Sequence, residues 1–296
     1  VLVSVRTASL NFPDLLIVEG KYQFKPPLPF VPGSEFAGVV DSVGPGVTAY
    51  NKGDRVASVV GVGGFGTHSV VAASQLIPLP VAMPFEHGAA FVLTYGTSHH
   101  ALLDRAALVA GETLLVLGAA GGVGTAAIQI AKQVGARVIA GASTDEKAAF
   151  CRSLGADVVI NYSTGNLRDE IKAATAGRGP DVIYDPVGGA LADPAFRSIG
   201  WRGRYLVVGF TAGIPSLPLN LTLLKGASVV GVFWGDFVRR EPAAFGRSIA
   251  ELSAMYAAGQ VGPVIDRVLP MSDLAEGYRR MASREAMGKI VLVNQT

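Results

Sequence analysis

Cysteine, histidine and charge are all scarce in this sequence. The single cysteine, Cys151, excludes an intramolecular disulfide framework and any metal site built from several cysteines. The four histidines show no metal-ligand spacing, because the adjacent His99 and His100 would point to different faces of a helix. His68 and His87 are isolated. One cysteine also fits a reducing compartment, and we expect a cytoplasmic protein.

Charged residues make up only 16% of the chain, and the formal net charge is +2. No run of Lys and Arg with interleaved aromatic residues occurs, so nothing in the sequence supports nucleic-acid binding. The hydrophobic fraction of 50% predicts a packed globular protein, and 296 residues suffice for two ordinary domains.

A long uncharged stretch, from Thr113 to Ala131, would suggest a membrane span on hydropathy alone. Glycines interrupt it where a strand would turn into a helix, so a strand–turn–helix unit explains it better. We therefore expect no membrane segment. The chain opens at Val1 in an alternating strand pattern without a signal peptide. We expect the natural protein to have residues before this point.

The pattern of apolar residues divides the chain into three segments. Residues 1–95 alternate short apolar runs with Pro and Gly clusters, which predicts irregular β structure. Residues 96–234 contain six apolar strands separated by helices, which predicts a parallel, doubly wound α/β sheet covered on both faces. Residues 235–296 are too few for a separate domain, and we expect them to return to the first β region. The expected strands of the sheet are Leu114–Leu117, Arg137–Ala140, Val158–Ile160, Val182–Asp185, Tyr205–Val208 and Val229–Val232.

The first of these strands leads into a glycine-rich turn, Ala119-Ala120-Gly121-Gly122-Val123-Gly124. Small residues permit the tight bend there, and they let the backbone approach a pyrophosphate. The helix that follows offers free N–H groups and the positive end of its dipole to the phosphates. The motif alone also occurs as a tight turn in other doubly wound proteins. With five further strands present, we interpret it as a dinucleotide site held by Ala120, Gly121, Gly122 and Val123.

The end of the second strand indicates which dinucleotide binds. Sites that prefer NAD usually carry an Asp or Glu there, which accepts from the ribose 2′-OH. Here the position holds Ala142, and Ser143 and Lys147 follow with a hydroxyl group and a cation for a 2′-phosphate. Asp145 and Glu146 would favour NAD if the register differed slightly. We expect NADPH.

Several short motifs recur in a characteristic order: Ala8–Asp14, Gly20–Tyr22, Pro32–Gly38, Val43–Val47, Gly53–Val56 and Gly118–Gly124. In order and spacing they resemble the zinc-free quinone oxidoreductase branch, which includes zeta-crystallin, of the medium-chain dehydrogenase/reductase superfamily. The resemblance covers essentially the whole chain. It implies a GroES-like β domain formed by both chain ends, with a Rossmann domain between them. It also implies a homodimer formed through the apolar edge strand 227–233.

The same resemblance bears on metal binding. Zinc-containing relatives carry a cysteine where Asn11 stands and a histidine where Ser34 stands, so we expect no metal ion. Without a metal to polarise a carbonyl, simple alcohol oxidation lacks its Lewis acid. Quinones and activated enones depend less on a Lewis acid, because delocalisation stabilises the negative charge that follows hydride transfer.

The resemblance also implies roles for individual residues. It places Asn11 and Tyr22 near the nicotinamide and the substrate, as candidate catalytic residues. The Tyr22 phenol would donate a proton or stabilise an enolate; packing beside a proline-rich loop is its alternative role. For Asn11 the alternative is capping of local backbone, and Glu35 is expected to bind nearby backbone groups. Further expected cofactor contacts are Thr97 at the carboxamide, Lys147 and Tyr162 at the 2′-phosphate, and Phe210, Phe233 and Trp234 around the nicotinamide.

Three functions remain open at this point. The first is NADPH-dependent, metal-free reduction of quinones or α,β-unsaturated carbonyl compounds. The second is reduction of an enoyl thioester such as an enoyl-CoA. The third is a crystallin-like protein that binds NADPH without turnover, which fold alone does not exclude.

Overall fold

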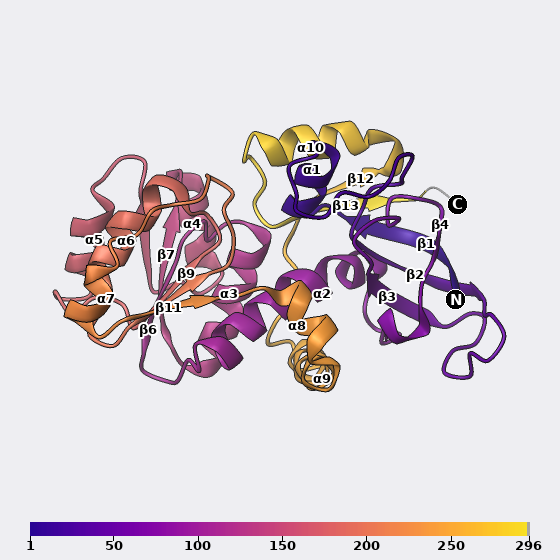
Figure 1. Ribbon diagram of the computed structural model, residues 1–296, viewed down its shortest axis with the longest axis horizontal. Coiled ribbons are helices and arrows are strands. Elements are labelled where there is room, and N and C mark those ends of the chain that lie inside the picture. Colours follow the sequence, from indigo (N-terminus) through magenta and orange to yellow (C-terminus); the bar gives the residue numbers. More distant parts are fainter. Residues whose placement is uncertain (295–296) are drawn as a thin grey trace. The chain divides into compact units, whose positions relative to one another are not determined.

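The computed structural model describes residues 1–294, and the chain divides into two compact units (Figure 1). Unit 1 combines Val1–Leu93 with the segment that begins at Pro263. Unit 2 is Thr94–Gly262. Both chain ends therefore belong to unit 1, and unit 2 is inserted between its two parts.

Unit 1 is built on a seven-stranded sheet in which every strand pair except β12–β13 is antiparallel. In β1, Val3 and Val5 are buried and their neighbours are less so, the alternation of a strand covered on one face. The two chain ends pair directly, with Ala8 opposite Leu292. The strand order is β12 (Ile265–Pro270), β13 (Lys289–Val293), β1 (Leu2–Ser9), β2 (Glu35–Ser42), β3 (Arg55–Val59) and β5 (Leu76–Pro78), while β4 (His68–Val70) pairs with β1.

Helices complete unit 1 beside the sheet. The short helix α1 (Phe12–Val18) follows β1, and it lies next to α10 (Leu274–Ala282), which precedes the last strand (Figure 1). The first part of α2 (Phe85–His99) also belongs to this unit. Segments from the two ends of the sequence are thus interleaved, as predicted for the C-terminal return.

Unit 2 contains a six-stranded parallel sheet, which confirms the predicted doubly wound α/β fold. The chain proceeds from β6 toward β8 on one side and from β9 toward β11 on the other. The order therefore reverses between β6 and β9, where open α/β sheets bind ligands at the carboxyl ends of their strands. The strand order is β11 (Ser228–Gly231), β10 (Arg204–Val207), β9 (Val182–Asp185), β6 (Thr113–Val116), β7 (Arg137–Ala142) and β8 (Val158–Asn161).

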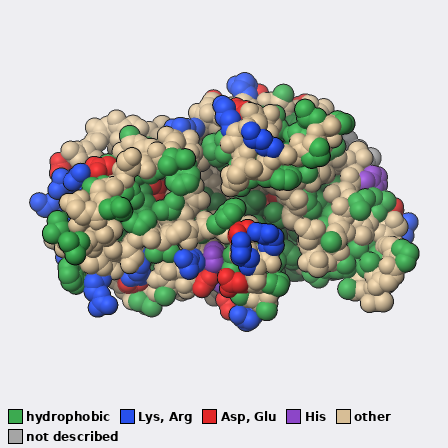
Figure 2. All heavy atoms as spheres, in the orientation of Figure 1, with side chains coloured by type: hydrophobic (Ala, Val, Ile, Leu, Met, Phe, Trp, Pro, Cys, Tyr) green, Lys and Arg blue, Asp and Glu red, His purple; other side chains and the backbone are tan. Residues whose placement is uncertain are grey.

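Helical crossovers join the strands of unit 2, and their apolar faces form a core that includes Leu115, Ile139, Ile183 and Phe196. The helices are α3 (Gly122–Val134), α4 (Asp145–Ser153), α5 (Leu167–Ala174), α6 (Ala192–Ser198) and α7 (Asn220–Lys225), followed by α8 (Trp234–Arg240) and α9 (Pro242–Ala257). Large apolar side chains on and beside α7 stay exposed (Figure 2). In the described part of the chain, no helix combines the length and the apolar character that crossing a membrane requires.

The second boundary differs from the one predicted at residue 234, because unit 2 continues to Gly262. The contacts of α8 and α9 explain the difference. The Trp234 indole packs closely on Gly96 of α2, and Ser248 Oγ lies 3.0 Å from Nδ1 of the buried His99. Gly262 N donates to Gln129 Oε1 at 2.8 Å. These helices therefore pack on the part of α2 that belongs to unit 2, before the chain returns to unit 1.

Candidate functional site

The glycine-rich turn lies between the carboxyl end of β6 and the start of α3. Gly118 has a φ of +57°, in the left-handed region that favours glycine. At Gly124 the first turn of α3 lies very close to the chain that leaves β6, since a Cβ there would lie 2.6 Å from the carbonyl oxygens of both Gly118 and Ala119. Only glycine lets the first turn of the helix pass this close to the strand.

The start of α3 presents unused N–H groups. Gly121 N donates to Gly118 O, and Thr125 N donates to Gly121 O. Among the described residues, the N–H groups of Gly122, Val123 and Gly124 have no backbone acceptor. The first turn carries no acidic side chain. Free amides at the positive end of a helix dipole suit a pyrophosphate, so this turn fits the expected dinucleotide.

The second half of α2 is fixed to the start of α3. Ser98 Oγ donates to Val123 O at 2.9 Å and lies 2.9 Å from the buried Tyr184 hydroxyl. The adjacent residue, Thr97, is buried on the same helix. The structure thus brings α2 to the glycine-rich turn, and the contact of Thr97 with the carboxamide stays a prediction. Ser98 and Tyr184 were missed, because the apolar pattern of β9 gives no sign that the Tyr184 hydroxyl has a partner.

The residues expected at a 2′-phosphate surround the end of β7. Ala142 is buried there, and its carbonyl accepts from Tyr162 N at 3.0 Å. The Tyr162 ring lies next to Gly141, 3.5 Å from where a Cβ would stand. Ser143 follows Ala142, and Lys147 lies in the first turns of α4, where its N–H is capped by the Thr144 hydroxyl.

The carboxylate that could favour NAD is engaged elsewhere. Asp145 Oδ1 accepts from Asn161 Nδ2 at 2.8 Å, so this side chain turns toward the end of β8. The position at the strand end holds Ala142, without charge. The end of β7 therefore carries no carboxylate of its own.

Three aromatic residues were expected around the nicotinamide, and their settings differ. Phe210 lies beside Gly188, which has a left-handed φ of +66° after β9, and the ring is exposed. Phe233 is also exposed. Trp234 is buried, with its ring 5.8 Å from that of Phe245 and edge-on to it. Trp234 packs on Gly96 of α2, and its contact with the nicotinamide stays a prediction.

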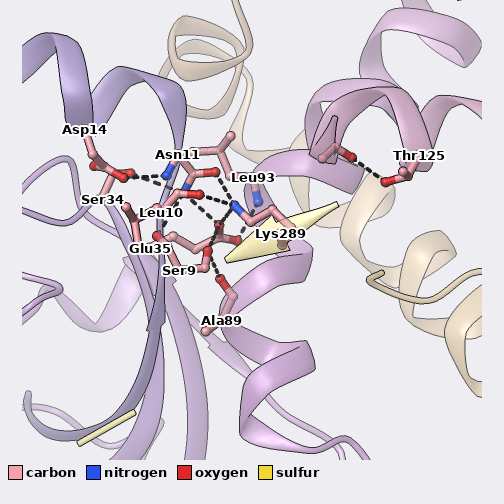
Figure 3. Close-up of polar contacts among 11 residues, drawn as sticks. Ser9, Leu10, Asn11, Asp14, Ser34, Glu35, Ala89, Leu93, Thr125 and Lys289 are labelled. Atoms are coloured by element: carbon pink, nitrogen blue, oxygen red, sulfur yellow. Dashed lines mark hydrogen bonds and ion pairs between the residues drawn. The ribbon is translucent and has the colours of Figure 1, made fainter. Parts of the chain in front are cut away.

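In unit 1, a buried polar cluster surrounds Asn11 (Figure 3). Asn11 Oδ1 accepts a short hydrogen bond from Lys289 Nζ, and Asn11 Nδ2 donates to Glu35 Oε2 at 3.1 Å. An ammonium group can only donate, and a carboxylate only accepts. The Asn11 amide therefore has one orientation, with its oxygen committed to Lys289.

Glu35 and Lys289 bind the elements around them. Glu35 Oε1 accepts from Leu93 N at 2.9 Å and Oε2 from Ser9 Oγ at 3.1 Å, which agrees with the expected structural role of Glu35 (Figure 3). Lys289 Nζ also donates to Leu10 O at 3.0 Å and lies 3.5 Å from Glu35 Oε2. Burial lowers the pKa of Lys289, and the carboxylates of Glu35 and Asp14 oppose that shift.

Asp14 connects this cluster to Tyr22. Asp14 Oδ2 accepts from Asn11 N at 2.8 Å and so caps α1, but Oδ1 has no hydrogen-bond partner among the described residues. Burial raises the pKa of Asp14 to about 6. Burial and the Asp14 charge also raise the pKa of the half-buried Tyr22 phenol. Tyr22 therefore remains a proton donor at neutral pH.

The Asp14 carboxyl predicts a pH dependence of stability. Its folded pKa of about 6 exceeds the ordinary 3.8, so the folded state binds the proton more tightly. Its contribution to the free energy of unfolding should therefore fall by up to about 3 kcal/mol between pH 4 and 6, and stay constant above that. In Asp14→Asn, which keeps an acceptor for Asn11 N, this fall should disappear from urea-unfolding curves. An unchanged pH dependence in the variant would assign it to other groups.

In residues 1–294, no group of three or more His, Cys, Asp or Glu side chains is arranged to hold a metal ion. Asn11 stands where zinc-containing relatives carry a cysteine, and its oxygen binds the ammonium group of Lys289. Ser34 is buried beside it, with its hydroxyl 3.5 Å from Asn11 Nδ2. Lys289 was missed from the sequence, because 278 positions separate it from Asn11.

Comparison with known proteins agrees with this architecture. A family model described as an alcohol dehydrogenase GroES-like domain matches residues 1–81, and one described as a zinc-binding dehydrogenase matches residues 122–252. Quinone oxidoreductase-like protein 2 homolog from Nematostella vectensis is 38% identical over 296 residues, which is 99% of this chain and 81% of the relative.

Solved structures also resemble this chain over almost its whole length. A mycobacterial protein complexed with NADPH has a TM-score of 0.92 and 30% identity, covering 99% of this chain and 90% of that one. The CurK enoyl reductase has a TM-score of 0.90 and 26% identity, covering 100% of this chain and 91% of its own.

A GroES-like unit joined to a parallel dinucleotide-binding sheet defines the medium-chain dehydrogenase/reductase superfamily, a class of oxidoreductases with an NAD(P)-binding fold. Within that class, the chain belongs to the quinone oxidoreductase branch. The family and the fold class predicted from the sequence are thereby confirmed.

Proposed function

We propose that the protein reduces quinones or α,β-unsaturated carbonyl compounds with NADPH, without a metal ion. The observation that carries the proposal is the setting of Asn11, whose oxygen is bound by the Lys289 ammonium and not available to a metal. A substrate must then tolerate negative charge without a Lewis acid, as quinones and enones do by delocalisation. Tyr22, held protonated near Asp14, would supply the proton that an enolate needs.

The residues of unit 2 support NADPH as the cofactor. When bound, the dinucleotide supplies the hydride. The free amides of Gly122, Val123 and Gly124 would bind its pyrophosphate. Ser143, Lys147 and Tyr162 would bind the 2′-phosphate at the end of β7, where no carboxylate opposes it.

A panel of acceptors tests the proposed function. Oxidation of NADPH and NADH would be followed with a benzoquinone, a simple enone and an enoyl-CoA. We expect turnover with the quinone or the enone and a clear preference for NADPH. Turnover confined to the enoyl-CoA would favour enoyl thioester reduction, for which the Tyr22 phenol and the likeness to the CurK enoyl reductase are the supporting observations. Tight NADPH binding with no turnover would favour a crystallin-like role.

Replacing Lys147 with Met tests the cofactor preference. The loss of one cation beside the 2′-phosphate should raise the KM for NADPH roughly tenfold, the effect of one charge-assisted contact at a partly exposed site. The KM for NADH should not change, because NADH lacks that phosphate. The two cofactors thus serve as each other's control, and an equal effect on both would contradict a 2′-phosphate contact.

Replacing Tyr22 with Phe tests its role as the proton donor. We expect kcat for the enone to fall roughly 10²-fold, in the range of general acid catalysis. The affinity for NADPH should be unchanged, since the ring remains. Burial raises the pKa of Tyr22 above its ordinary value of 10.0. The wild-type rate should therefore show no decrease from deprotonation of the Tyr22 phenol up to pH 10. Unchanged enone turnover in the variant would remove Tyr22 from the mechanism.

We also propose that two copies associate through β11. This strand is the edge of its sheet, and exposed apolar side chains precede it on α7, among them Leu223, which is 82% exposed, and Leu224. An exposed edge of this kind invites pairing with a second chain. Sedimentation velocity should show a dimer that Leu223→Glu/Leu224→Glu converts to a folded monomer. Val81→Glu, at an exposed position of unit 1, is the matched control.

The one cysteine supports our proposal of a reducing compartment such as the cytoplasm. Cys151 is buried and free. Burial raises the pKa of its thiol to about 12, so the reactive thiolate is scarce. A packing role therefore accounts for this residue.

A further inference from the structure

A pocket of unit 2, apart from the glycine-rich turn, is lined by positive charge. It has a volume of about 210 Å³ and lies between α5, the end of α6 and the end of α7. Figure 2 shows Lys and Arg side chains at this end of the unit. The cationic residues that line the pocket are Arg168, Lys172, Arg178, Arg197 and Lys225, and Gly177, Gly179, Ser198 and Ile199 complete it.

The pocket is separate from the dinucleotide site. Arg178, Ile199 and Lys225 precede β9, β10 and β11, so they mark the amino ends of these strands. The glycine-rich turn follows β6 and lies at the carboxyl end of the same parallel sheet. The two sites therefore lie at opposite ends of the parallel strands.

Two of the five cations are partly compensated. Arg197 Nε pairs with Asp193 at 2.8 Å. Lys225 Nζ donates to Arg197 O at 2.6 Å and Ile199 O at 2.7 Å, and so caps the end of α6. These contacts use the carbonyl groups that a helix end leaves free.

The other three cations have no ion pair in the described part of the chain. Arg168 and Lys172 are four residues apart on α5, where like charges on one helix face repel. The charge of Arg168 also lowers the pKa of Lys225 across the pocket, in addition to the effect of burial. The fold thus keeps uncompensated positive charges together around a concave surface.

We propose that this pocket binds a small anion that carries more than one phosphate group, of the size of a diphosphate. Guanidinium groups pair with phosphate oxygens through two parallel hydrogen bonds, and three arginines line the pocket. Its volume is below the roughly 300 Å³ at which pockets for drug-sized ligands begin, which suits a diphosphate better than a nucleotide. An anion there would relieve the repulsion among Arg168, Lys172 and Lys225.

Titration calorimetry with inorganic pyrophosphate at constant ionic strength tests the proposal. We expect one site per chain, and its affinity should persist when NADPH is saturating. Lys172→Gln/Arg178→Gln should weaken binding about tenfold, the effect of two exposed charges. The control Arg239→Gln/Arg247→Gln removes two exposed charges of unit 2 outside the pocket and should bind as the wild type does.

Three results would overturn the proposal: no binding of pyrophosphate, equal weakening in both double variants, or sulfate binding as tightly as pyrophosphate. Since both substituted residues are exposed, unchanged melting temperatures without ligand should accompany the loss of affinity. The result is independent of the proposed reductase activity. Pyrophosphate binding that depends on Lys172 and Arg178 would stand even if NADPH did not bind.

Discussion

Replacing Lys289 with Met should lower the free energy of unfolding by about 3–5 kcal/mol, the range observed when one partner of a buried ion pair is removed. The Lys289 side chain is 5% exposed and the Glu35 side chain 0%, so water cannot replace the lost ammonium. The substitution also leaves the oxygen of Asn11 and the carbonyl of Leu10 without their donor. Each unsatisfied buried acceptor adds to the loss.

Urea unfolding would measure this effect, with Lys52→Met as the control. Lys52 pairs with Asp41 at 3.5 Å on the surface, and its loss should change stability by no more than about 0.5 kcal/mol. The double variant Lys289→Met/Glu35→Gln should recover part of the loss, because the uncompensated charge is removed. Equal stability of Lys289→Met and Lys52→Met would show that the buried cluster contributes little.

Replacing Gly124 with Ala should weaken NADPH binding by roughly 10²-fold or more. The new Cβ would lie 2.6 Å from two backbone oxygens, so the start of α3 must move away from the end of β6. Overpacking of this kind costs about 1–3 kcal/mol of stability. The same movement displaces the amides of Gly122 and Val123 from the pyrophosphate, and an error of about 1 Å at such a site is enough to lose most of its affinity.

Gly246→Ala provides the matched control in the same unit. Gly246 lies within α9, and a Cβ there meets nothing within 4 Å. Alanine should stabilise the helix by about 0.5–1 kcal/mol and leave NADPH binding unchanged. Fluorescence titration with NADPH and thermal unfolding would compare the two variants. Wild-type affinity in Gly124→Ala would contradict the role of this close approach.

Local patterns were enough to predict unit 2. The inner strands of its parallel sheet are buried and mostly apolar, as in β6, and all six strands lie within two residues of their predicted ends. The glycine-rich turn was also predictable, because its backbone geometry is encoded in adjacent residues. The end of unit 2 at Gly262, predicted at residue 234, could not be found from local patterns. It depends on the contacts of Ser248 with His99 and of Gly262 with Gln129, which join segments far apart in the sequence.

The candidate site of unit 1 was predictable only in part. The local motif around Asn11 and Tyr22 identified the right region of the chain. It did not indicate that Lys289 orients the Asn11 amide, because that contact joins residues 278 positions apart. Nor did it single out Asp14, whose carboxylate is 1% exposed. Burial of this kind depends on α10 and β13 from the other end of the chain.

The insertion of unit 2 between the two parts of unit 1 has a consequence for synthesis on the ribosome. Unit 2 is complete once Gly262 has emerged, whereas β13 and Lys289 are translated after it. Until then, Asp14 and Glu35 lack their counter-cation, and burying them would be costly. The segment of unit 1 that precedes unit 2 must therefore wait for the segment that follows it, so unit 2 is expected to fold before unit 1.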